Sequence, residues 1–158
     1  MSANQDLRIQ AYWTTFLGSL PDGTVSAHTA YQAWGFGDGS EMADSLGALV
    51  RNGTKTATAS LVWAYEVEDE PLPKVGDFSI ILDGQGEPLC IIQMTEIYIC
   101  PFDEVDEEQA YLEGEGDRSL GFWREVHWEF FSRECEVLGH DPSQKMPVLC
   151  ERFKLVYP

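Results

Sequence analysis

The segment GTKTAT at residues 53–58 carries a lysine among hydroxyl side chains, directly after a predicted helix. A strand is predicted to begin within it, because Thr56, Ala57 and Thr58 alternate as strand residues do. At such a junction backbone N–H groups can lack partners and side chains can reach a ligand. The segment is not a Walker loop, because the upstream glycine is missing. Lys55 is therefore a candidate site residue, although ordinary strand sequence also explains the threonines.

A second candidate is the acidic segment EGEGD at residues 113–117. Glycine is unfavourable inside a helix, so Gly114 and Gly116 predict a turn that presents the carboxylates. A cation site, a proton-transfer site and a solvated loop all fit this pattern. Nothing in the spacing demands a divalent metal.

The third candidate is an aromatic, amphipathic helix predicted over residues 119–138. Its spacing assigns most of the rings to the hydrophobic core. Trp123 and Arg124 are adjacent, however, and together such side chains can stack on a base or sugar.

The elements that must position these residues form an α+β pattern. The predicted helices span residues 5–19, 27–34, 40–52 and 119–138, with Ser40 as a cap and Gly53 as a terminating glycine. The predicted strands span residues 77–83, 88–100 and 147–157, and the first two form a hairpin. Residues 60–65 fit a helix or a strand, and residues 102–115 fit a helical or irregular segment. We find no repeat and no linker, which favours one domain over residues 1–158 built around a small mixed sheet or barrel.

Composition restricts the partners. The chain has 158 residues, 44% of them hydrophobic, and a formal net charge of -17 with only 10 Lys and Arg. So few basic residues argue against duplex DNA and against an anionic membrane as binding partners. The acids concentrate late in the chain, with twelve acids and three bases in residues 101–140 against five and three in residues 1–60. A small positive site near Lys55 is therefore expected to admit a nucleoside or a short single strand.

Apolar runs are too short to span a membrane, and no signal peptide is visible, so a cytoplasmic location is expected. The four cysteines and three histidines share no ligand spacing, which predicts structural thiols, no metal site and no cofactor.

Taken together, three stretches resemble the longer bacterial branch of the ASCH domain family: FGDGSEMADSLGALVRNGTKTATASLVWAYE, VGD, and PLCIIQMTEIYICPFDEVDEEQAYLEGEGDRSLGFWREVHWEFF. The resemblance covers residues 34–158 and leaves residues 1–33 as an N-terminal helical extension. It implies a PUA-like mixed β-barrel with flanking helices. ASCH domains are proposed as RNA-binding modules, and some members are hydrolases.

One branch of short members hydrolyses the amide of acetylated cytidine with a Lys, a Thr three residues later and a distant Glu. By motif, Lys55, Thr58 and Glu113 are the matching catalytic residues, although this chain is longer and Glu113 lies beside further acids. In the implied mechanism a partly desolvated Lys55 acts as a base toward the Thr58 hydroxyl. Glu113 holds Lys55 or relays a proton to the leaving amine. The predicted substrate-binding residues, which include backbone N–H groups for an oxyanion, are Gly53, Thr54, Thr56, Glu115, Asp117, Trp123 and Arg124.

Two alternatives stay open. A single-stranded RNA-binding module without turnover would use Lys55 for a phosphate and an aromatic ring for a base. A ribonuclease would need the same site to accept a polymer. Salt dependence of binding and product formation distinguish these functions.

Overall fold

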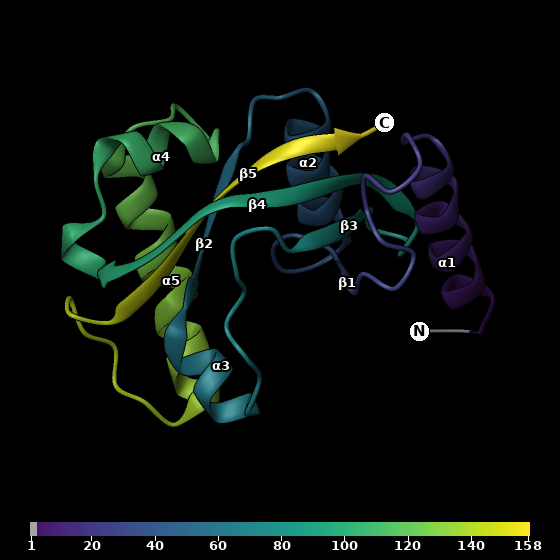
Figure 1. Cartoon of the computed structure of the whole chain (residues 1–158). Coiled ribbons are helices and arrows are strands. Elements are labelled where there is room, and N and C mark those ends of the chain that lie inside the picture. Colours follow the sequence, from purple (N-terminus) through teal and green to yellow (C-terminus); the bar gives the residue numbers. More distant parts are fainter. Residues whose placement is uncertain (1–2) are drawn as a thin grey trace. The chain divides into compact units, whose positions relative to one another are not determined.

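A computed structural model describes residues 3–158 of the chain. Figure 1 shows its helices and strands. The helices are α1 (Ala3–Gly18), α2 (Ser40–Arg51), α3 (Val62–Glu68), α4 (Glu107–Glu113) and α5 (Leu120–Leu138), with a 3-10 turn η1 (Phe102–Glu104). The strands are β1 (Tyr31–Trp34), β2 (Ala57–Leu61), β3 (Phe78–Leu82), β4 (Pro88–Pro101) and β5 (Pro147–Tyr157). The chain is thus α+β, as the sequence predicts.

The five strands form one sheet in the order β1-β3-β4-β5-β2. β3 and β4 pair antiparallel as the predicted hairpin, whereas β1 runs parallel to β3. The predicted closure into a barrel is wrong, because β1 and β2 are the two ends of this order among the described residues. Closure would need hydrogen bonds between these ends. β1 has only four residues, and β2 has five before the chain turns into α3.

The described chain divides into two compact units. The first comprises the chain up to Gly53, Gly76–Met94 and Lys154–Pro158. Its core is rich in aromatic side chains, and Trp13 of α1 stacks on Tyr31 of β1 with ring centroids 4.7 Å apart. The predicted extension over residues 1–33 contains α1, and its first two residues lie outside the described part. The prediction of a single domain over the whole chain stays a prediction.

The second unit comprises Thr54–Val75 and Thr95–Phe153. Its core includes Leu61 of β2, Trp123 and Phe131 of α5, and Cys150 of β5. Helix α4 packs against both β2 and α5. This unit therefore brings the Lys55 segment, the EGEGD turn and the aromatic helix into one packed body.

The helix predicted over residues 119–138 is confirmed as α5. Ser119 caps it by accepting a hydrogen bond from the Phe122 N–H, and Gly139 ends it in the left-handed conformation. The helix expected over residues 27–34 is wrong: Tyr31–Trp34 is β1, because pairing with β3 overrides the local helical pattern. The cap of α2 is Gly39 rather than Ser40. In the described part of the chain, no helix has the length and hydropathy to cross a membrane.

Candidate functional site

Lys55 is a buried cation in the short segment between α2 and β2. Its side chain is 2% exposed, and its Nζ donates to the Glu113 carbonyl oxygen at 3.3 Å and to Oε2 of Glu115 at 2.8 Å. Nζ also lies 3.7 Å from Oε1 of Glu113. A lysine ammonium has three N–H donors, and three protein oxygens surround this one. Lys55 thus serves as a cationic donor between two carboxylates.

Glu113, the last residue of α4, is the more buried carboxylate, with 1% of its side chain exposed. Its Oε2 accepts hydrogen bonds from Nε1 of Trp123 and from Nε2 of Gln109, the latter at 3.2 Å. Its Oε1 faces Lys55 and, at 3.5 Å, Nε2 of His127. Each oxygen of this carboxylate therefore has two nitrogen neighbours.

These neighbours set the protonation state of Glu113. Burial raises the pKa of its carboxyl. Hydrogen bonding by His127, the charges of Lys55 and His127, and the Trp123 hydrogen bond outweigh that effect and hold the pKa below the ordinary value of 4.5. At neutral pH Glu113 is therefore an anchoring carboxylate. Of the two roles implied by the resemblance, holding Lys55 fits this state better than relaying a proton.

Two members of this cluster are absent from the predicted site residues. His127 stacks on Trp123 with ring centroids 4.1 Å apart, and its Nδ1 lies 2.8 Å from the Trp123 carbonyl oxygen. Gln109 is fully buried and also donates to the Thr58 carbonyl oxygen at 3.1 Å. Both could have been found from helical spacing: Gln109 precedes Glu113 by four residues, and His127 follows Trp123 by four.

The EGEGD segment is the turn that joins α4 to α5. Gly114 and Gly116 have φ angles of 72° and 58°, and a Cβ atom at Gly114 would lie 2.6 Å from the Thr54 carbonyl oxygen. The turn therefore needs glycine both for its conformation and for its close approach to the strand segment. It places the Glu115 carboxylate on Lys55, and Glu115 keeps 17% of its side chain exposed.

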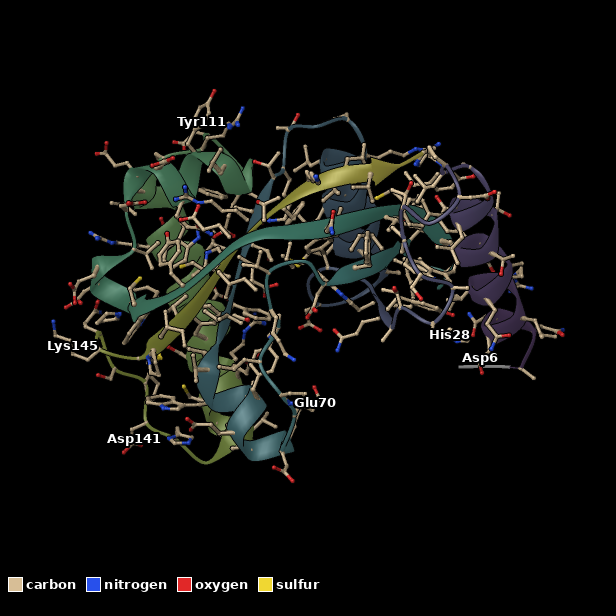
Figure 2. All side chains as sticks on the ribbon, in the orientation of Figure 1. Asp6, His28, Glu70, Tyr111, Asp141 and Lys145 are labelled. Atoms are coloured by element: carbon tan, nitrogen blue, oxygen red, sulfur yellow. The ribbon has the colours of Figure 1, made fainter. Side chains whose placement is uncertain are left out.

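The side chain of Arg118 also stabilises this turn. It has a φ of 64°, which is strained for a residue with a Cβ atom. Its Nε donates to the Tyr111 carbonyl oxygen at 2.9 Å and its Nη2 to the Thr54 carbonyl oxygen at 3.4 Å. The guanidinium also lies 3.7 Å from the centroid of the Tyr111 ring, which projects outward from α4 in Figure 2. Arg118 thus ties the turn to the residue before Lys55.

Thr58, the predicted nucleophile, contacts this cluster through its backbone carbonyl. In β2 it lies between Ala57 and Ala59 and pairs with Glu151 of β5. Because side chains alternate along a strand, the Thr58 side chain points to the face opposite Ala57 and Ala59. Ala59 packs against the core that contains Trp123, so the hydroxyl points away from that core.

The remaining predicted ligand residues from the strand segment are engaged through their backbones. The Gly53 N–H donates to the Val50 carbonyl oxygen and so ends α2. The Thr54 carbonyl oxygen accepts from Arg118, and the Thr56 N–H donates to the Leu112 carbonyl oxygen at 2.8 Å.

Asp117, the predicted ligand residue at the end of the acidic turn, is exposed, and its carboxylate accepts a hydrogen bond from the Ser119 N–H. Hydrogen bonding with Ser119 lowers the pKa of this carboxyl.

The two predicted stacking residues have other partners. Trp123 is 2% exposed, and its indole binds Glu113. Arg124 donates from Nη2 to the carbonyl oxygens of Asp103 and Val105, at 3.1 and 3.3 Å. Both side chains therefore contribute to the packing of α5. Within residues 3–158, no group of three His, Cys, Asp or Glu side chains is placed to hold a metal ion.

Comparison with known proteins identifies the family. The family model for the ASCH domain matches residues 32–157. The crystal structure of an ASCH domain from Lactobacillus crispatus JV V101 is 35% identical, with a TM-score of 0.89, and the match covers 96% of this chain and 95% of that one. A protein from Enterococcus faecalis V583 is 37% identical, with a TM-score of 0.85 and coverage of 95% and 88%.

A third solved structure, of a hypothetical protein, shares the fold at 18% identity. Its TM-score is 0.53, and the match covers 80% of this chain and 99% of that one. The chain has no match among curated proteins. The family model and the two structures above 30% identity agree, and this chain belongs to the ASCH domain family.

Proposed function

We propose that this protein binds short single-stranded RNA or a nucleotide, with Lys55 as the contact to a phosphate. ASCH domains are generally thought to bind RNA. The observation that carries the proposal for this chain is the buried Lys55 ammonium, held between Glu113 and Glu115. Burial of a charge is unfavourable, and such groups concentrate at functional sites.

The charge of the chain limits the ligand. A net charge of -17 repels a long polyanion, while one cation can pair with one phosphate. We therefore expect a shallow dependence of affinity on salt, close to that of a single neutralised phosphate on a single strand. A duplex of the same sequence should bind more weakly.

Fluorescence anisotropy with a labelled RNA hexamer tests this function. Lys55→Gln should weaken binding by about tenfold, because it removes a charge-assisted hydrogen bond. Lys74→Gln is the matched control: it removes the same charge from an exposed position of the same unit, and affinity should change by less than about twofold. Equal effects of the two variants, or hexamer binding that salt does not weaken, would refute the proposal.

A second candidate function is hydrolysis of the amide of an acylated cytidine. The observation that favours it is the hydrogen bond from Nζ of Lys55 to a carbonyl oxygen, that of Glu113. The same donor could stabilise the oxyanion that forms when an amide carbonyl is attacked. We assign the attack to a water molecule, because the Thr58 side chain points away from the Trp123 core. The C–N bond then breaks, giving a carboxylic acid and cytidine, whose amine takes up the proton.

Chromatography of acylated cytidine incubated with the protein tests this second function. Release of cytidine that Lys55→Gln abolishes would support it. If Thr58→Val also abolishes release, the attack belongs to Thr58 and not to water. The hexamer, analysed in the same way, would reveal the shortened products expected of a ribonuclease.

A further inference from the structure

Of the residues around Lys55, Glu115 is the one that a ligand can replace. Nζ of Lys55 is enclosed by Glu113, which is 1% exposed, and by Glu115, which is 17% exposed. Glu113 is bound in addition by Trp123 and Gln109. Glu115 therefore forms the solvent side of the site, and its carboxylate accepts the shorter of the two Lys55 hydrogen bonds.

We infer that the Glu115 carboxylate occupies the position of a ligand's phosphate and is displaced from Lys55 when the ligand binds. This inference rests on the proposed function and specifies its ligand class, a phosphate-bearing nucleotide rather than an uncharged nucleoside. The electrostatic reason is an exchange of like charge. A carboxylate and a phosphodiester each bring one negative charge and two oxygen acceptors, and a phosphate monoester brings at least as many of both, so the pairing of Lys55 is conserved.

The backbone of the turn need not move for this exchange. Gly114 and Gly116 fix the turn against Thr54 and Phe122, because a Cβ atom at either glycine would collide with these residues. Rotation about the side-chain bonds of Glu115 is enough to release the ammonium, and such rotations are fast for partly exposed side chains. On its solvent side Lys55 is thus covered by the Glu115 carboxylate, which belongs to a turn whose backbone stays in place.

The same arrangement predicts that the Glu115 carboxylate competes with the ligand's phosphate for Lys55. In the free protein Glu115 already pairs with Lys55, so the ion pair between Lys55 and the phosphate forms only when the ion pair between Lys55 and Glu115 breaks. Removal of the Glu115 charge should therefore tighten phosphate binding. An uncharged ligand gains nothing from the change, because it offers no anionic oxygen to the ammonium.

Calorimetric titration with cytidine 5′-monophosphate, inorganic phosphate and cytidine tests the inference. Glu115→Gln should bind the monophosphate about tenfold more tightly than the wild type, bind phosphate more tightly too, and leave cytidine unchanged. Glu107→Gln is the matched control, because it removes one negative charge by the same substitution from an exposed position of the same unit. It should change monophosphate affinity by less than about twofold.

Three outcomes would overturn the inference. Equal tightening by Glu115→Gln and Glu107→Gln would assign the effect to overall charge. Weaker monophosphate binding by Glu115→Gln would make Glu115 a ligand contact. Persistence of the tightening in the double variant Lys55→Gln, Glu115→Gln would separate it from Lys55.

The two proposals can fail separately. If Glu115→Gln tightens the monophosphate but no RNA hexamer binds, the site takes nucleotides and the RNA-binding function is wrong. If the hexamer binds through Lys55 while Glu115→Gln has no effect, only the displacement is wrong.

Discussion

The indole nitrogen of Trp123 donates a hydrogen bond to Oε2 of Glu113, with Trp123 2% and Glu113 1% exposed. This contact joins the first turn of α5 to the last residue of α4. It orients the carboxylate so that Oε1 faces Lys55 and His127. A tryptophan for which the sequence left core packing and ligand stacking open thus holds the anion that pairs with the site lysine.

Glu113→Gln should be strongly destabilising. It leaves Lys55 with one counter-charge instead of two, and an amide cannot accept at both of its ends. We expect a loss of about 3 kcal/mol in the free energy of unfolding, the usual result of breaking a buried ion pair. Urea unfolding measures it, and Glu107→Gln, in the exposed first turn of α4, should cost less than about 0.5 kcal/mol. Similar losses in the two variants would contradict the buried role of Glu113.

The stability that Glu113 contributes should disappear in acid. Its folded pKa lies below the ordinary value of 4.5, because His127, Lys55 and Trp123 outweigh the effect of burial. A carboxyl with a lowered folded pKa contributes stability that is complete above its unfolded pKa and is lost as the pH falls through the folded one. The difference in Tm between wild type and Glu113→Gln should therefore be present at about pH 5 and above and shrink below about 4.5. A difference that grows in acid would be inconsistent with this assignment.

Glu134 should behave in the opposite way. Burial, with a smaller contribution from the charge of Glu68, raises the pKa of its carboxyl. A raised folded pKa means that the charged form destabilises the fold, so this penalty appears as the pH rises through that pKa. Glu134→Gln should therefore stabilise the protein at pH 7, on the order of 0.5 kcal/mol, and have little effect below pH 4. Thermal melting at both pH values tests this, with the exposed Glu136→Gln as a control that stays near wild type.

The sequence predicts elements well where their ends are chemically marked. Helix α5 begins at the cap Ser119 and ends at Gly139, and both signals are local. β1 is different: its residues become a strand because β3 pairs with them and Trp13 stacks on Tyr31, and neither partner is visible locally. The failure to close a barrel has the same origin, because strand order depends on pairings between distant segments.

The candidate site shows the same division. The motif match names Lys55 and Glu113, whose side chains lie next to each other in the structure, and the two glycines correctly predict the turn that carries Glu115. It gives no direction for Thr58, because the face of a strand to which a side chain points depends on its pairing register. Arg118 could not be predicted, since its role comes from a left-handed backbone and two distant carbonyl oxygens.

Arg118 provides the last prediction, because its backbone and its side chain act in opposite directions. Arg118→Ala and Arg118→Gly both lose the hydrogen bonds to Tyr111 and Thr54, so both should be less stable than wild type. The left-handed φ of 64° costs a residue with a Cβ atom about 1–2 kcal/mol, whereas the entropy of glycine costs about 0.5–1 kcal/mol. Arg118→Gly should therefore be more stable than Arg118→Ala by roughly 0.5–1 kcal/mol in urea unfolding. Gly139→Ala is the matched control at a left-handed position with open space, and it should lose a similar amount. If Arg118→Ala proved the more stable of the two, the strain at this position would not exist.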